Sequence, residues 1–159
     1  MHTFQLTALP AAPFAALFDL SDDVLAAHHH AQRCIATESS GYPCRVSLQD
    51  AAQGEELLLL PYEHQPAASP YRASGPIFVR RGAAQRRLPA GELPPYLTQR
   101  LLSVRAYDAA DLIVDASVRE GAEVAGEIAR LFGNPAVAYL HLHFAKRGCF
   151  ACRVDRVRT

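Results

Sequence analysis

The 159-residue sequence has no tryptophan, only one methionine and no surplus of charge, because 16 basic side chains balance 16 acidic ones. Without excess positive charge, non-specific nucleic-acid binding is not expected. No apolar run of about 18 residues is present, which argues against a membrane-spanning helix. Residues 1–10 lack a basic segment followed by a long apolar one. We therefore expect no secretion signal and a cytoplasmic location.

Cysteine is scarce too. Its four positions, Cys34, Cys44, Cys149 and Cys152, are too few for a disulfide-built scaffold in a chain of this length. We therefore expect reduced thiols. Half of the residues are hydrophobic, which excludes a disordered chain. The length suits a single domain over residues 1–159.

Charge is divided unevenly along the chain. Residues 1–71 contain two basic and eight acidic side chains, whereas residues 72–159 contain fourteen basic and eight acidic ones. Two interpretations remain open. The basic half forms an anion-binding surface, or the two halves pack together and neutralise each other.

Strands are predicted over several segments, among them 33–37, 55–62, 77–80, 101–107, 112–119, 137–144 and 149–157. Most show alternation of apolar and polar residues, whereas 55–62 contains four consecutive leucines, which suit a strand buried on both faces. Four helices are expected: one after Pro10, one over 22–29 capped by Ser21, one over 47–52 and one over 120–132. Short turns between successive strands favour antiparallel pairing. The predicted fold class is α+β, with one mostly antiparallel sheet of about six to seven strands, helices on one face and a polar patch on the other.

The two closing strands have a predictable register. Their apolar residues share one face when each of three pairs lies opposite: Phe144 with Phe150, Leu142 with Cys152, and Leu140 with Val154. Residues 146–148 then form a three-residue loop in which Gly148 has a positive φ. The other face presents Tyr139, His141 and His143.

Five ordered motifs resemble a bacterial family catalogued as domain of unknown function 1203. The motifs are Gly41-Tyr42-Pro43-Cys44-Arg45, the segment from Gly54 to Tyr62, Ser69-Pro70-Tyr71, the segment from Ser74 to Arg80, and Gly148-Cys149-Phe150. The resemblance spans nearly the whole chain and implies a small bacterial stand-alone protein. It implies no activity, so no catalytic residue follows from it.

The leading functional hypothesis is a binding domain for a small anionic ligand or a protein partner. Arginine suits the forked recognition of carboxylate or phosphate. The candidate ligand-binding residues are Arg45, Arg72, Arg80, Arg105, Tyr139 and Arg153. Salt bridges to the acidic half are an equally strong explanation for the arginines. A homodimer remains open.

The second hypothesis is a small enzyme with Cys44 as nucleophile. Cys44 precedes Arg45, and an adjacent guanidinium or the start of a helix at Ser47 would favour the thiolate. Its base would come from His64, His141 or His143. The alternative is a buried loop thiol, which is favoured because free cysteines are commonly buried.

The third hypothesis is a metal-dependent enzyme that uses His141 and His143, with Cys149 as the nearest third ligand. Nothing in the sequence identifies that ligand with certainty, so no bound metal is expected. The spacing of Cys149 and Cys152 sends their side chains to opposite faces of a strand, which argues against a redox or zinc pair. Residues 74–76 lack the glycine spacing and lysine of a phosphate loop. No cofactor is expected.

Overall fold

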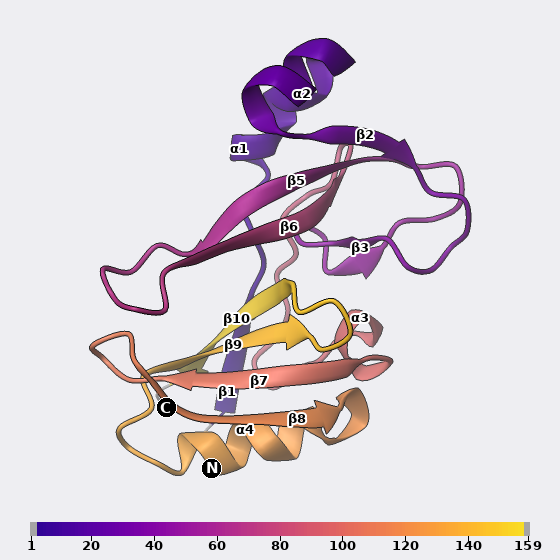
Figure 1. Cartoon of the computed structure of the whole chain (residues 1–159). Coiled ribbons are helices and arrows are strands. Elements are labelled where there is room, and N and C mark those ends of the chain that lie inside the picture. The colour runs from indigo at the N-terminus through magenta and orange to yellow at the C-terminus, as the bar shows by residue number, and fades with distance from the viewer. Residues whose placement is uncertain (1–2, 158–159) are drawn as a thin grey trace.

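The computed structural model describes residues 3–157 and contains two five-stranded sheets (Figure 1). The first sheet has the order β1 (Thr3–Thr7), β10 (Phe150–Val157), β9 (Tyr139–Phe144), β7 (Leu101–Tyr107) and β8 (Ile113–Glu120). The second has the order β2 (Gln32–Ile35), β5 (Glu56–Gln65), β6 (Ala73–Arg80), β3 (Pro43–Cys44) and β4 (Gln49–Asp50). All pairs are antiparallel except β3 with β6.

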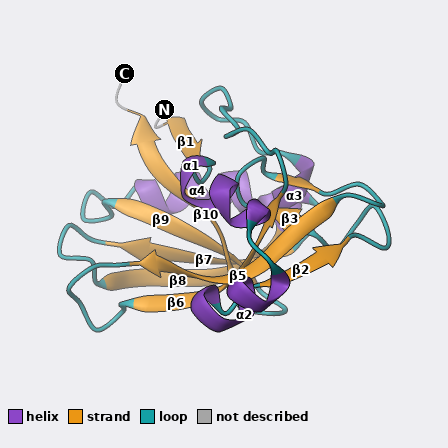
Figure 2. Cartoon of the chain, turned by 90° about the horizontal axis from the view of Figure 1, so that it is seen from above, coloured by secondary structure: helices purple, strands orange, loops and turns teal. Residues whose placement is uncertain are grey.

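The α+β class and the mostly antiparallel pairing are confirmed, but the strands divide between two sheets instead of forming one. Figure 1 shows the second sheet lying across the face of the first sheet that points away from α4 (Val124–Phe132). Figure 2 shows the first and last strands, β1 and β10, side by side. No helix within residues 3–157 is long and apolar enough to cross a membrane.

The predicted apolar face of the last helix is confirmed. Val124, Ile128, Leu131 and Phe132 are buried in α4 and belong to the core cluster of the first sheet. Each such side chain contributes about 1.5–3 kcal/mol when it leaves water. The helix packs on β1, β7 and β8, on the face of this sheet that points away from the second sheet.

The remaining helices are short. They are α1 (Ala12–Ala15), α2 (Asp22–His29), α3 (Pro95–Thr98) and the 3-10 turns η1 (Ala16–Asp19) and η2 (Gly121–Glu123). Ser21 caps α2 as expected, because its side chain accepts the Val24 N–H at 3.3 Å.

The helix predicted over 47–52 is wrong. The Leu48 N–H donates to the Cys44 carbonyl in a tight turn, and Leu48 has a φ of 50°. A left-handed residue ends any helix at that point. The chain then turns back so that β4 pairs with β3.

The closing hairpin has the predicted register with one correction. Leu142 lies opposite Cys152 and Leu140 opposite Val154, and Gly148 has a φ of 77°. A bulge between Phe150 and Cys152 places Phe150 opposite His143 instead of Phe144. The extra residue of a bulge re-aims the side chains beside it. Phe150 therefore packs among the histidines.

The polar face of the first sheet was expected to be an open patch, but the structure shows it covered. His141 and His143 retain only 3% and 1% of their exposure, because the second sheet covers them. Phe150 also belongs to the core cluster of the second sheet, with Leu58 and Leu60. The two sheets are thus joined by a packed, partly polar layer.

Candidate functional site

A cleft of about 590 Å³ is lined by residues of both sheets and of the loops beside them. We call it the basic cleft. Its lining residues from the second-sheet side are Gly41, Pro43, Arg45, Leu59, Pro76 and Phe78, and from the first-sheet side Gln99, Arg100, Leu101, Glu120, Phe144, Lys146, Arg147 and Cys149. Four of these side chains are cationic and one, Glu120, is acidic.

The tight turn between β9 and β10 presents two of the cations. The Gly148 N–H donates to the Phe144 carbonyl at 2.7 Å, and the Phe144 N–H donates to the Cys149 carbonyl at 2.8 Å. These bonds close a short loop that leaves Lys146 and Arg147 exposed at the mouth of the cleft. Glycine tolerates the positive φ that this loop requires.

Arg45 forms the buried wall of the cleft and is only 1% exposed. Its guanidinium donates from Nε to the Phe150 carbonyl at 2.8 Å, from Nη1 to the Pro43 carbonyl at 2.6 Å and from Nη2 to Cys149 Sγ at 3.1 Å. The group also lies 5.0 Å from the centre of the Phe144 ring.

Arg45 makes no ion pair with any carboxylate of residues 3–157, although buried charges are costly unless they are paired. Arg100 differs, because its Nη2 donates to Asp50 Oδ1 at 2.7 Å. It also lies 5.0 Å from the centre of the Phe144 ring, so the two guanidinium groups share one aromatic neighbour. The cleft therefore contains a buried positive charge that lacks an acid.

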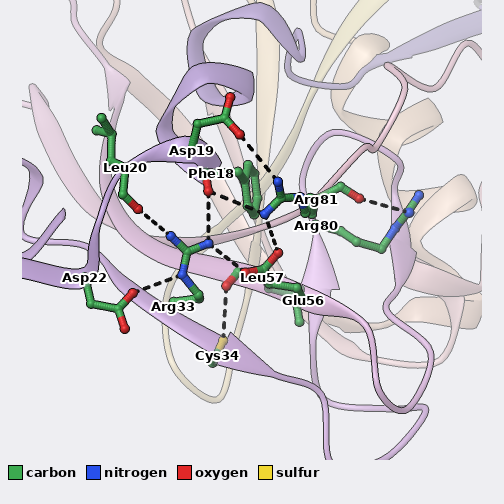
Figure 3. A network of polar contacts seen from close by, with 10 residues as sticks. All are labelled: Phe18, Asp19, Leu20, Asp22, Arg33, Cys34, Glu56, Leu57, Arg80 and Arg81. Atoms are coloured by element: carbon green, nitrogen blue, oxygen red, sulfur yellow. Dashed lines mark hydrogen bonds and ion pairs between the residues drawn. The ribbon is translucent and has the colours of Figure 1, made fainter. Parts of the chain in front are cut away.

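Several arginines expected to bind a ligand pair with acids instead. Arg72 donates to Glu63 at 3.3 Å and Arg80 to Glu55 at 3.2 Å, and neither lines the basic cleft. Figure 3 shows a network beside Arg80, in which Arg33 and Arg81 both donate to Glu56 and Arg80 donates to the Arg81 carbonyl. Most of these acids belong to residues 1–71, as the interpretation of internal neutralisation predicts.

Three of the other candidates line a second cavity of about 490 Å³, which we call the histidine cavity. Tyr139, His141 and Arg153 line it, together with His64 and Phe150. The Arg153 guanidinium lies 4.0 Å from the centre of the Tyr139 ring and bonds Asp155.

Arg105 follows on the neighbouring strand, opposite His141, and donates to Ser103. It does not line either cavity. The sheet face that was expected to bind a ligand therefore supplies only part of its polar residues to an accessible space.

Three histidines gather around Phe150. Ring centres of His64 and His143 are 5.0 Å apart, those of His64 and His141 6.2 Å, and those of His141 and His143 6.3 Å. One ring nitrogen in each of the three is buried and has no hydrogen-bond partner. Burial lowers the pKa of both His141 and His143 to about 3, so both rings are neutral near pH 7.

The metal hypothesis finds no completed site in the described part of the chain. No group of three His, Cys, Asp or Glu side chains within residues 3–157 is arranged to hold a metal ion. Cys149, the expected third ligand, contacts Arg45 instead of the histidines. Instead of Cys149, the ring of His64 lies beside His141 and His143. His64 is far from both in the sequence, so the sequence gave no sign of this contact.

Cys44, the predicted nucleophile, is fully buried. Its sulfur accepts the Ser47 N–H at 3.5 Å and the Arg80 N–H at 3.3 Å. The burial matches the alternative interpretation of a buried thiol, but Cys44 lies in β3 and not in a loop as expected. Cys149 is instead half-buried, lines the basic cleft and contacts the guanidinium of Arg45. Sequence reasoning weighed Cys149 as a metal ligand and as part of a redox pair, but not as a nucleophile.

The motifs that suggested a family resemblance meet at this cleft. Four of the five contribute lining residues: Gly41, Pro43 and Arg45 from the first, Leu59 from the second, Pro76 and Phe78 from the fourth, and Cys149 from the fifth.

Comparison with known proteins gives one match. No curated protein and no solved structure is significantly similar to the chain. Residues 41–156 match the family described as "Protein of unknown function (DUF1203)", and this range includes all five motifs. The match covers well over half of the sequence and confirms the expected resemblance. The chain belongs to the DUF1203 family.

Proposed function

We propose that the protein binds a small anion, such as phosphate or a carboxylate, in the basic cleft. The observation that supports this most directly is Arg45, whose charge is buried beside the cleft with no carboxylate partner among residues 3–157. A bound anion would provide the missing negative charge. Arginine is suited to forked contacts with phosphate and carboxylate.

The other cations of the cleft support the same ligand class. Lys146 and Arg147 are exposed at the cleft and free to turn towards a ligand, whereas Arg100 already bonds Asp50. Grouped charges of one sign raise the local concentration of counter-ions in a cleft. Arg72 and Arg80 are left out of this proposal because both pair with acids elsewhere.

Thermal unfolding in phosphate tests the proposal. A ligand at about 100 times its dissociation constant stabilises the folded state by roughly 2.7 kcal/mol, which corresponds to a rise in Tm of roughly 5–10 °C for a chain of this size. Sodium chloride of equal ionic strength is the reference, and the rise must saturate at low millimolar phosphate, because sulfate and phosphate stabilise proteins generally at high concentration.

The double variant Lys146→Gln, Arg147→Gln should lose most of the phosphate effect. Arg72→Gln is the matched control, since Arg72 is an exposed arginine outside the cleft. A phosphate effect that never saturates, or that is equal in both variants, would show that the cleft binds no anion.

A further inference from the structure

Cys149 is the side chain that completes the contacts of Arg45. Its sulfur lies 3.1 Å from Nη2, and within residues 3–157 it is the only side chain that accepts a hydrogen bond from the guanidinium. An arginine guanidinium is always charged, and a cation beside a thiol favours the thiolate, which is the nucleophilic form. Cysteines beside arginine are reactive for this reason.

We propose that Cys149 is a nucleophile that attacks small electrophiles carrying a carboxylate or phosphate, held in the basic cleft. The inference rests on the proposed anion binding, because the cations of the cleft would hold the charged end of the electrophile. Arg45 has a separate role, since it stabilises the sulfur as the attacking thiolate.

The other three cysteines lack this combination. Cys44 and Cys152 are buried in the two core clusters. Cys34 is half-buried, its sulfur donates to the Leu57 carbonyl at 3.8 Å, and burial raises its pKa. All four cysteines are free. Only Cys149 lines the basic cleft.

The chemical step can be written for a defined probe, iodoacetate. The Cys149 thiolate attacks the CH₂ carbon, an S–C bond forms, the C–I bond breaks, and iodide leaves with the electron pair. The thiol proton is lost to solvent before the attack, so the step needs no histidine base. His143 is engaged elsewhere, since its Nδ1 bonds the Gly148 carbonyl at 2.9 Å.

The test compares two reagents that differ in charge. Iodoacetate carries a carboxylate, whereas iodoacetamide is neutral and of similar size. Rate constants at Cys149 are measured at pH 7 by mass spectrometry of digested peptides, and the ratio of iodoacetate to iodoacetamide is taken for the folded protein and for the chain unfolded in urea. Both reagents meet the same sulfur, so exposure cancels in the ratio.

We expect the ratio to be at least about tenfold higher in the folded protein, because a cationic cleft raises the encounter rate of anions by about 10- to 1000-fold. The Lys146→Gln, Arg147→Gln variant should lose most of that preference, and Arg72→Gln should keep it. Equal ratios in the folded and unfolded chain would overturn the proposal.

Two further measurements separate this proposal from anion binding itself. The rise in Tm with phosphate is measured on the unmodified protein, and Arg45→Met should slow the reaction of Cys149 with neutral iodoacetamide. If phosphate stabilises the protein but iodoacetate gains no preference at Cys149, the nucleophile is refuted and anion binding stands. If neither effect occurs, both proposals are refuted. If Arg45→Met does not fold, the Lys146→Gln, Arg147→Gln variant still tests the Cys149 proposal.

Discussion

Arg45 Nη2 lies 3.1 Å from Cys149 Sγ, although the two residues are 104 positions apart in the sequence. The same guanidinium bonds the Phe150 carbonyl at the start of β10 and the Pro43 carbonyl at the start of β3. A single buried side chain therefore connects the first sheet to the second and also forms the wall of the basic cleft. Arg45 therefore contributes both to the stability of the fold and to the proposed chemistry of the cleft.

Replacing Arg45 should cost more stability than replacing its sulfur partner. Arg45→Gln leaves buried carbonyl groups without donors, and each such group costs about 1–3 kcal/mol. We expect the free energy of unfolding to fall by about 2–5 kcal/mol, against less than about 1 kcal/mol for Cys149→Ala. Urea denaturation measures both. Equal losses in the two variants would mean that Arg45 does not join the sheets.

Acid should destabilise the protein through its buried histidines. The pKa of both His141 and His143 is lowered to about 3, mainly by burial, whereas an unfolded histidine titrates near pH 6.5. Between these values the unfolded chain binds more protons than the folded one. Stability is therefore fully present above pH 6.5 and is lost as the pH falls below it, by about 1.4 kcal/mol per pH unit for each histidine.

Chemical denaturation at pH 7.5 and 5.5 measures this loss, which should be about 1.4 kcal/mol from each of the two histidines. The His141→Gln variant should show roughly half of the wild-type pH dependence. His28→Gln, at an exposed position of α2, is the control and should leave it unchanged. An unchanged slope in His141→Gln would show that this ring does not stay neutral in the folded protein.

Glu127 should anchor α4 to β8 through its charge. Its Oε2 and Oε1 accept from Arg130 at 3.0 and 2.7 Å, and its Oε1 accepts the Ser117 hydroxyl at 2.6 Å. The hydrogen bonds from Arg130, and then that from Ser117, lower the pKa of Glu127 to about 2. The stabilisation is present above about pH 4.3 and is lost as the pH falls towards 2.

At pH 7 the Glu127→Gln variant should unfold more easily by about 1–3 kcal/mol, because the neutral amide cannot accept all of these bonds. Glu123→Gln, an exposed acid just before α4, should change stability by less than about 0.5 kcal/mol. Denaturation curves that rank the two variants in the opposite order would contradict this assignment.

Two glycines near α4 should respond to alanine in opposite directions. A Cβ on Gly121 would lie 2.2 Å from the Leu97 carbonyl oxygen, so Gly121→Ala must displace backbone and lower the Tm. A Cβ on Gly126 would meet nothing within 4 Å, and Gly126 lies inside the helix. Gly126→Ala should therefore raise stability by about 0.5–1 kcal/mol. Thermal unfolding of both variants checks the sign.

Local features of the fold were predictable from the sequence. Ser21 capping α2, the apolar face of α4 and two of three core pairs in the β9–β10 hairpin all depend on residues a few positions apart. The bulge at Phe150 was not predictable, because an inserted residue leaves the alternation of apolar side chains almost intact on either side.

The division into two sheets and the site between them depend on distant contacts. The leucine run of β5 and the alternation along β6 predict strands but do not say which strands they join. The polar face of β9 was expected to be open, yet His141 is covered by a sheet formed by residues more than 60 positions earlier in the chain, such as those of β6. Pairing of Arg45 with Cys149 belongs to the same class of long-range contact.

A phosphate titration followed by two-dimensional NMR of the amide groups tests most directly whether an anion binds in the basic cleft. We predict shifts that saturate at low millimolar phosphate and concentrate on residues 99–101 and 146–150, which line or flank the cleft. Small, non-saturating shifts spread over the whole chain, or saturable shifts centred on His64 and Tyr139 of the histidine cavity, would contradict it.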